Sequence, residues 1–267
     1  MKKLGLMVLV AGIILMAGCA GDDPAGGGGG TLEVVTGVAI GSASAGRDVV
    51  LTWNAVSDVD GYYVYFRENT SDEWGTAVGD VTTNAFTHTA SSAGYYVVVA
   101  YEGTNTSSAN STEVNTMPEQ INVTYTIWDN HAPADEHSGF IFGATSGTTG
   151  LAASTSFIQD IYCYDGGWTQ SPCGFYSGNV APFGTGNPTD MIEAGSTYGY
   201  PSGTQWWVTG WILAGDIVFA ELSDGHFVKI YVNSVPQHST QPASHGIVFY
   251  YDYQPIEGLY LFTTESS

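Results

Sequence analysis

The chain has 267 residues, of which 43% are hydrophobic and 12% are charged. Its 26 acidic residues face only five basic ones, which gives a formal net charge of −21 at pH 7. A surface this acidic repels nucleic acid and anionic lipid headgroups, so the composition argues against binding to bare nucleic acid.

Residues 1–19 have the three parts of a secretory signal peptide. Two lysines give a positive start, an apolar run follows from Leu4 to Met16, and small residues precede Cys19. A transmembrane helix is the weaker interpretation, because about 15 apolar residues span roughly 22 Å and the hydrocarbon core is roughly 30 Å thick. We therefore expect export.

The end of this leader, Leu15-Met16-Ala17-Gly18-Cys19, resembles the bacterial lipoprotein box, with Met16 at the position where leucine is usual. The resemblance implies that Cys19 becomes the lipidated first residue. It also implies a protein anchored to the bacterial cell envelope. The choice of membrane stays open, with the outer membrane or cell surface favoured over the inner membrane. Without the leader, the basic residues that remain are Arg47, Arg67 and Lys229.

Residues 20–31 are expected to form a flexible tether. They include five consecutive glycines, from Gly26 to Gly30, and no side chains that could build a core. A flexible segment of this length has a typical end-to-end distance of roughly 19 Å. The tether would hold the following domains away from the membrane.

Residues 32–117 are expected to form an antiparallel β-sandwich. Val49, Leu51 and Trp53 alternate with the residues between them, which is the period of a half-buried strand. Tyr62, Val64 and Phe66 repeat this pattern after a turn. Short strands separated by turn residues, without a helical period, are typical of a sandwich.

Three runs of this unit look like strands B, C and F of a fibronectin type III domain: Val50-Leu51-Thr52-Trp53-Asn54, Asp60-Gly61-Tyr62-Tyr63-Val64-Tyr65 and Gly94-Tyr95-Tyr96-Val97-Val98-Val99-Ala100. The resemblance implies that Trp53 is the core tryptophan. It places Tyr96, or alternatively Tyr95, at the tyrosine-corner position. In bacteria such domains are mostly spacers or binding modules.

Residues 118–267 are expected to form a second β-sandwich, which makes the chain an all-β protein with two antiparallel sandwiches in tandem. Alternation from Ile121 to Ile127 predicts a strand. Asp224-Gly225 lies between two alternating runs and favours a tight hairpin turn with positive φ. We expect Ile247–Tyr253 to continue the meander and Leu259–Phe262 to close it.

Parts of this second unit are similar to HmuY-type surface lipoproteins, some of which bind haem. The matching runs are Gly215-Asp216-Ile217-Val218, Asp224-Gly225-His226-Phe227-Val228-Lys229-Ile230 and Val248-Phe249-Tyr250-Tyr251-Asp252-Tyr253-Gln254. The resemblance implies a fold more than a function. Under a ligand-capture interpretation, Met191 and His226 are candidate ligands by position only.

Cys163 and Cys173 remain once Cys19 is assigned to lipidation. An oxidising compartment preserves disulfides, so we expect these two residues to be bridged, with two separate thiols as the alternative. Closing so short a loop would stabilise the fold by about 2.5–3 kcal/mol on the chain-entropy model.

A loop after the first strand of the second unit gathers residues that divalent ions prefer. Histidine with carboxylate suits zinc or a similar ion. No recognised ligand spacing is present, so a solvated acidic loop is the simpler interpretation, and we expect no metal or other cofactor. The candidate ligands are Asp129, His131, Asp135, Glu136 and His137.

Residues 164–211 combine glycine with large aromatic side chains. Exposed rings on glycine-bearing loops can stack on a sugar or bind a protein. The alternative is that these rings fill the core of the sandwich. The rings singled out for ligand contact are Trp168, Tyr198, Tyr200, Trp206 and Trp207.

Together these features predict an envelope-anchored, non-enzymatic binding or adhesion lipoprotein that presents a protein-binding or glycan-binding sandwich on a spacer domain. No Gly-x-Ser-x-Gly elbow, His-Glu-x-x-His motif or phosphate loop is present in the sequence. Two alternatives stay open: capture of a small ligand, metal or haem, and a secreted hydrolase whose paired carboxylates meet only in the fold.

Overall fold

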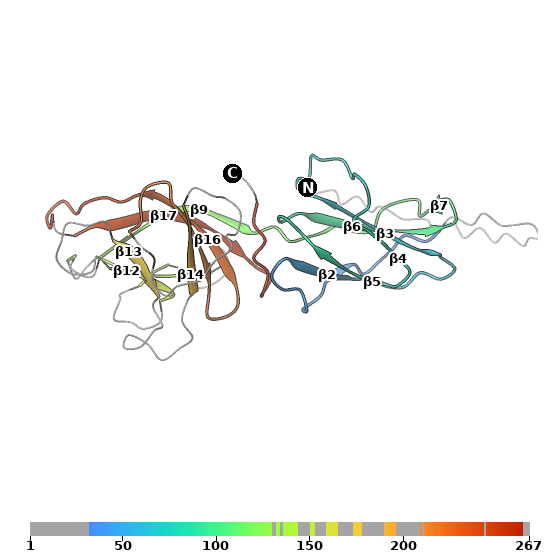
Figure 1. Ribbon diagram of the computed structural model, residues 1–267, viewed down its shortest axis with the longest axis horizontal. Helices are drawn as coiled ribbons and strands as arrows, with labels where there is room; N and C mark the ends of the chain where they lie inside the picture. Colours follow the sequence, from blue (N-terminus) through green and yellow to red (C-terminus); the bar gives the residue numbers. More distant parts are fainter. Residues whose placement is uncertain are drawn as a thin grey trace, which may run out of the picture. The chain divides into compact units, whose positions relative to one another are not determined.

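The computed structural model describes residues 32–129, 132–133, 136–143, 150–152, 159–164, 173–177, 190–195, 209, 211–242 and 244–263. Every strand pair in this part of the chain is antiparallel, and none of these residues is helical. Residues 32–267 belong to one compact unit. The prediction of an all-β fold built from antiparallel sheets is confirmed (Figure 1).

Two sheets pack face to face in the N-terminal sandwich (Figure 1). The first sheet has the order β1-β2-β5 and contains β1 (Ala39–Ile40), β2 (Asp48–Thr52) and β5 (Ala85–Thr89). The second has the order β4-β3-β6-β7 and contains β4 (Gly79–Val81), β3 (Gly61–Arg67), β6 (Tyr95–Glu102) and β7 (Asn105–Thr106), with β8 (Val114–Asn115) also paired to β6.

The core of this sandwich follows the alternation of the sequence. Val49, Leu51 and Trp53 are buried, and the Trp53 ring meets the Tyr62 ring edge-on with centroids 5.3 Å apart. Tyr96 is fully buried and Tyr95 is only half-buried, so Tyr96 is the core residue of the pair. The hydroxyl of Tyr96 lies 2.9 Å from His88 Nδ1, and burial raises the pKa of this tyrosine.

The C-terminal sandwich is built around a five-stranded sheet of order β14-β15-β16-β17-β9. Its strands are β14 (Asp190–Gly195), β15 (Ile217–Glu221), β16 (Phe227–Ser234), β17 (Gly246–Gln254) and β9 (Glu119–Trp128). A four-stranded sheet of order β11-β10-β12-β13 contains β11 (Gly150–Ala152), β10 (Gly139–Ile141), β12 (Ile161–Tyr164) and β13 (Gly174–Ser177).

Side chains from both sheets fill one core. Phe140, Phe175, Phe249 and Tyr251 are fully buried there, and the Phe140 and Phe249 rings meet at right angles with centroids 5.1 Å apart. The predicted hairpin joins β15 to β16 through a turn in which Gly225 has a φ of 83°. The alternate residues on one face of this hairpin all lie in this core: Val218, Ala220, Leu222, Val228, Ile230 and Val232.

The expectation that Leu259–Phe262 closes the C-terminal meander is wrong. Leu259 and Leu261 lie in the core of the N-terminal sandwich, with Trp53 and Tyr96. The chain changes direction at Gly258, whose φ of 81° is rarely adopted by other residues. Alternation of apolar residues in Leu259–Phe262 does not specify which sandwich covers them. The sequence pattern therefore placed this segment in the wrong sandwich.

Backbone hydrogen bonds fix this final segment, which we call the tail (Gly258–Thr263). Gly46 N donates to Gly258 O at 2.7 Å, and Tyr260 N donates back to Gly46 O at 3.1 Å. Ala93 N donates to Phe262 O at 3.1 Å. The tail therefore completes the N-terminal sandwich, although it follows the last strand of the C-terminal one.

Truncation of a buried tail residue tests this role. We expect Leu261→Ala to lower the free energy of unfolding by about 2–5 kcal/mol, because it leaves a cavity in a core that relaxes only partly. Leu261 is 2% exposed, whereas Leu213, at 57%, provides a matched control whose alanine variant should differ from wild type by less than about 0.5 kcal/mol. Urea unfolding followed by tryptophan fluorescence measures both, and equal stability of the two variants would contradict the assignment.

Candidate functional site

The most exposed large apolar side chain among the described residues is Trp211, at 68%, and Leu213 follows at 57%. Ile212 between them is fully buried. Because alternate residues of an extended segment point to opposite sides, Trp211 and Leu213 project together away from the core. We call Trp211 and Leu213 the exposed apolar pair.

Hydrogen bonds on both sides hold the backbone that carries the exposed apolar pair. Thr209 N donates to Phe175 O at 2.9 Å, and Ile212 N donates to Cys173 O at 3.2 Å, so this segment runs alongside the start of β13. Leu213 N donates to Asp216 Oδ2 at 2.8 Å just before β15 begins. A backbone that is already ordered loses little conformational entropy when a partner binds.

The aromatic window divides between core and surface. Phe175 is fully buried, Tyr176 packs against Tyr162 with centroids 5.5 Å apart, and Trp211 is exposed. The window therefore supplies both core rings and an exposed ring. The five rings singled out from sequence lie outside the described residues: Trp168, Tyr198, Tyr200, Trp206 and Trp207.

Asp129, the first residue of the candidate metal loop, is buried and already satisfied. Its carboxylate accepts hydrogen bonds from Ser244 Oγ at 2.8 Å and from His245 N at 2.6 Å. These bonds join the end of β9 to the segment before β17. Asp129 is therefore placed to hold two strand ends together.

The rest of that loop makes different contacts. Glu136 Oε1 lies 3.6 Å from His238 Nε2, and His137 O accepts a hydrogen bond from Trp128 N. His131 and Asp135 lie outside the described residues. Within the part of the chain that the structure describes, no group of three His, Cys, Asp or Glu side chains could hold a metal ion.

Cys163 and Cys173 are buried thiols in this structure, so the predicted disulfide is not formed in it. Cys163 pairs with Phe175, two residues beyond Cys173, which makes the cysteines diagonal neighbours. Such neighbours are roughly 7–8 Å apart, near the upper limit for a bridge. Cys163 Sγ instead donates to His245 O at 3.9 Å. Formation of the bridge after export stays a prediction.

The two candidate ligands for the capture alternative lie on different segments, Met191 on β14 and His226 in the turn before β16. Met191 on β14 pairs with Ala220 on β15, which in turn pairs with Val228 on β16, so β14 and β16 are about 10 Å apart. The His226 ring stacks on Tyr253 with centroids 5.3 Å apart, and its Nδ1 lies 3.2 Å from Asp224 Oδ1. The neighbours of His226 are thus a ring and a carboxylate of its own sandwich.

Three acidic side chains act electrostatically on Tyr253: Asp160, Asp224 and Glu119. Burial raises the pKa of Asp160 to about 6, and the charge of Asp224 adds to the rise, while a hydrogen bond from Phe142 N at 2.8 Å opposes it. Burial and the charges of Asp224, Asp160 and Glu119 raise the pKa of Tyr253 to about 12. Asp160 is therefore partly protonated close to neutral pH.

The buried carboxyl of Asp160 makes stability depend on pH. Its raised pKa means that the folded state favours the protonated form, so the stabilisation is complete below about pH 4 and is lost as the pH rises to about 6. Asp160→Asn keeps an oxygen for Phe142 N but carries no charge. We expect it to match wild type near pH 4 and to be more stable by about 1–3 kcal/mol at pH 7.

Urea unfolding at both pH values measures this difference, with Glu68→Gln as the control, because Glu68 is exposed. Asp160→Asn should remain equal to wild type at pH 4 and exceed it at pH 7. A uniform loss of stability for Asp160→Asn at both pH values would show instead that the ionised carboxylate is required.

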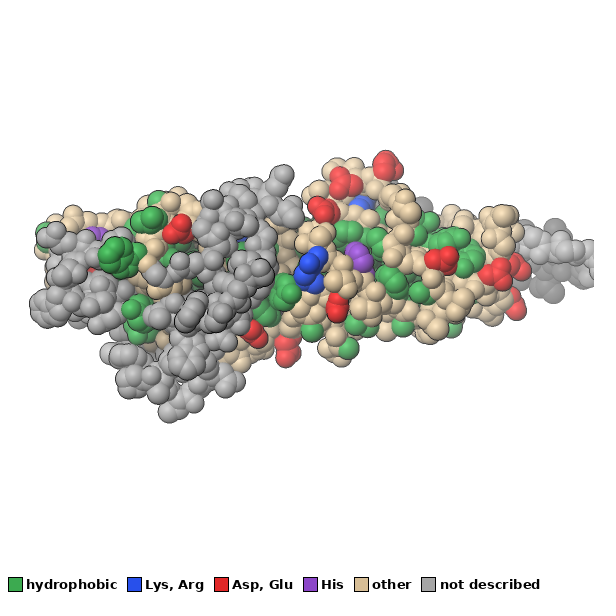
Figure 2. All heavy atoms as spheres, in the orientation of Figure 1, with side chains coloured by type: hydrophobic (Ala, Val, Ile, Leu, Met, Phe, Trp, Pro, Cys, Tyr) green, Lys and Arg blue, Asp and Glu red, His purple; other side chains and the backbone are tan. Residues whose placement is uncertain are grey.

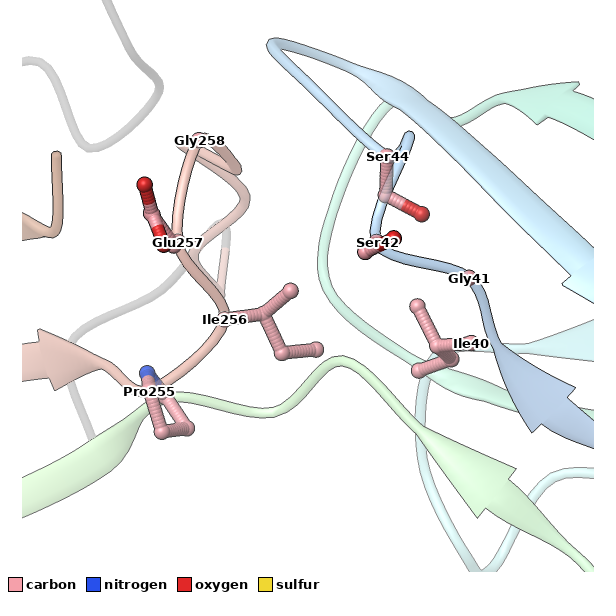
Figure 3. A pocket seen from close by; sticks show the side chains of 8 residues that line it. All are labelled: Ile40, Gly41, Ser42, Ser44, Pro255, Ile256, Glu257 and Gly258. Carbon is pink, nitrogen blue, oxygen red and sulfur yellow. The ribbon is translucent and has the colours of Figure 1, made fainter.

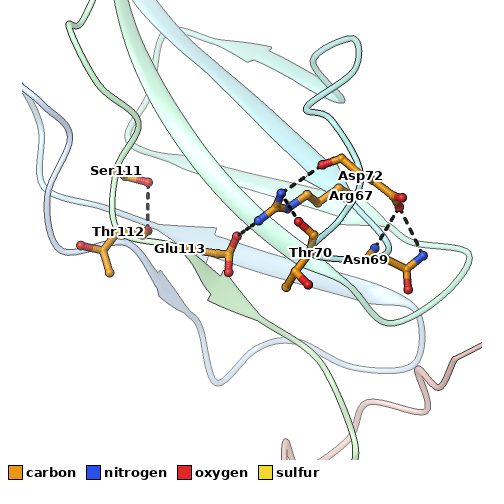
Figure 4. A network of polar contacts seen from close by, with 7 residues as sticks. All are labelled: Arg67, Asn69, Thr70, Asp72, Ser111, Thr112 and Glu113. Atoms are coloured by element: carbon orange, nitrogen blue, oxygen red, sulfur yellow. Dashed lines mark hydrogen bonds and ion pairs between the residues drawn. The ribbon is translucent and has the colours of Figure 1, made fainter. Parts of the chain in front are cut away.

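The three basic residues outside the leader all make internal contacts. Arg47 Nε donates to Ala90 O at 2.6 Å, and Lys229 Nζ donates to Thr263 O at 3.0 Å. Arg67 pairs with Glu113 at 2.7 Å and donates to the carbonyls of Thr70 and Asp72 (Figure 4). Its guanidinium carbon also lies 4.2 Å from the centroid of the Trp74 ring. On the face that Figure 2 shows, acidic side chains outnumber basic ones.

One open hollow of about 480 Å³ lies between the end of β1 and the turn after β17 (Figure 3). Ile40 and Ile256 face each other across it, with Ser42 and Glu257 near its rim. Ser44 Oγ already accepts a hydrogen bond from Val50 N at 2.9 Å. The hollow is open to solvent and lined by both aliphatic and polar side chains, so it would enclose little of a ligand's surface.

No protein-family model matches the chain, and a comparison with curated proteins finds no match either. Among the described residues there is no helix long and apolar enough to cross a membrane.

Proposed function

We propose that this protein is an envelope-anchored lipoprotein that binds a protein or glycan partner without catalysing a reaction. The N-terminal sandwich would act as a spacer, and the C-terminal sandwich would carry the binding surface. The observation that supports this proposal is the exposed apolar pair, Trp211 and Leu213, on an ordered backbone. Tryptophan is enriched among the residues that contribute most to binding energy.

The charge of the chain narrows the partner. Its basic residues make internal contacts, so the surface offers few cations to recognise phosphate or sulfate groups. An uncharged sugar, or a protein surface with an apolar patch and basic rim, would meet the exposed apolar pair without repulsion. The proposal thus excludes polyanions as partners.

Truncation of the exposed ring tests the binding surface. The full chain is applied to a glycan array and to a protein array, and each ligand found is titrated with the variants. We expect Trp211→Ala to weaken binding at least about tenfold, as for an interface residue of high energy. Val123→Ala on β9, at a site that is 57% exposed, is the control and should bind as wild type. An absence of ligands on both arrays, or equal affinity of the Trp211 variant, would refute this surface.

The anchor is tested separately. In cells fed an alkyne-labelled fatty acid, we expect wild type to take up the label and to fractionate with the envelope. Cys19→Ser should remain unlabelled and leave the envelope fraction, since the lipid supplies about 0.8 kcal/mol for each buried methylene. Retention of the serine variant in the envelope would contradict lipid anchoring through Cys19.

A hydrolase is the second candidate, and one observation favours it. Asp160 is partly protonated near neutral pH while the neighbouring Asp224 carboxylate is 60% exposed. A buried carboxyl group with a raised pKa, beside a carboxylate that faces solvent, is an arrangement that general acid catalysis uses. Release of reducing sugar from polysaccharides by wild type, and its loss in Asp160→Asn, would support this candidate over the first.

A further inference from the structure

The second face of the five-stranded sheet, opposite the main core, contains an amine and a carboxyl group side by side. Lys229 on β16 pairs in register with Asp252 on β17 and with Phe219 on β15. Residues paired in register point to the same face of a sheet. Lys229 is 0% exposed and Asp252 is 2% exposed, so water reaches neither side chain.

Aromatic side chains enclose this pair. Phe219, Phe227, Tyr231 and Phe262 form an apolar cluster on the same face, and Phe262 comes from the tail. Lys229 Nζ lies 5.1 Å from the centroid of the Tyr231 ring and 5.8 Å from that of Phe219. The Lys229 amine therefore lies over the aromatic rings of Tyr231 and Phe219.

Tyr231 contacts both members of the pair. Its ring lies beside the amine, and its hydroxyl donates to Asp252 Oδ2 at 2.7 Å. The Tyr250 ring stacks on it with centroids 4.8 Å apart, which fixes its orientation. The hydroxyl is thus directed at one oxygen of the carboxyl group.

The enclosed site favours the uncharged form of each group. Burial lowers the pKa of Lys229 to about 8, although the charge of Asp252 opposes this shift. Burial also raises the pKa of Asp252, against the hydrogen bond from Tyr231 and the charge of Lys229. A neutral amine is a nucleophile, and a protonated carboxyl can lose its hydroxyl as water.

We propose that Lys229 and Asp252 condense to form an intramolecular isopeptide bond between β16 and β17. Residues opposite each other in register have Cβ atoms about 4.5–5.5 Å apart, which the four-carbon stem of lysine can span. In this structure Lys229 Nζ donates a hydrogen bond to Thr263 O. The lysine side chain must therefore rotate toward Asp252 on β17 before the two groups react.

The chemical step balances without a cofactor. The lone pair of Lys229 Nζ attacks Asp252 Cγ, and a C–N bond forms. The Tyr231 hydroxyl stabilises the negative charge that develops on Oδ2. The bond from Cγ to the other oxygen then breaks, and that oxygen leaves as water with a proton from Nζ. The products are one amide and one water molecule, with nothing oxidised or reduced.

Mass spectrometry of the purified full chain tests the bond directly. After incubation at pH 8 under native conditions, we expect a mass lower than that of the unreacted chain by one water molecule. A protease digest should contain a branched peptide that joins the segments around Lys229 and Asp252. A wild-type chain of unreduced mass would overturn the proposal, and this readout requires no variant to fold.

Variants identify the reacting atoms. Lys229→Met and Asp252→Ala should each show the full calculated mass. Asp252→Asn should instead lose ammonia, because its amide nitrogen replaces the leaving oxygen. Tyr231→Phe keeps the ring but lacks the hydroxyl, so it should form the bond at least tenfold more slowly. Loss of water from Lys229→Met would show that other residues react and would refute this assignment.

Discussion

The central strands of the five-stranded sheet, β15, β16 and β17, are buried on both faces, and the rest of the structure depends on this constraint. One face packs against the four-stranded sheet, with Phe249 and Tyr251 in the main core. The other carries Phe219, Tyr231 and Phe262 in a second apolar cluster. A sheet that is covered on both faces needs apolar side chains on each face. In this chain the tail supplies part of the cover over the second face.

The tail links the two sandwiches through contacts of three kinds. Leu259 and Leu261 fill the N-terminal core, and Phe262 packs on Phe219 with ring centroids 5.5 Å apart. Gln254 Nε2 donates to Thr116 O at 3.0 Å and to Leu261 O at 2.7 Å, so one buried amide holds both the segment between β8 and β9 and the tail. Apolar burial and satisfied polar groups therefore act together, and removal of either would expose the other.

Local patterns predicted the strands well, because alternation and turn chemistry are encoded within a few residues. Val49 to Trp53 and the hairpin at Gly225 are examples. The tail was misassigned because two sheets can accept the same apolar alternation, and only tertiary packing decides between them.

The burial of Lys229 was not predicted either, since a lysine within a strand is usually solvated and its cover comes from residues more than thirty positions away. Of the exposed apolar pair, Trp211 falls within the broad aromatic window and Leu213 was not predicted. The burial of Phe175 and the exposure of Trp211 depend on the long-range backbone hydrogen bonds that their segments make.

The order in which the chain is made has a consequence for the folding of the N-terminal sandwich. The core of this sandwich contains Leu259 and Leu261, which leave the ribosome more than 140 residues after its last strand. Until they appear, the early strands lack two of the side chains that cover their apolar surface, so they form at most an incomplete core. The export that we propose would benefit from this delay, because a chain without a complete core passes more easily through a translocation channel.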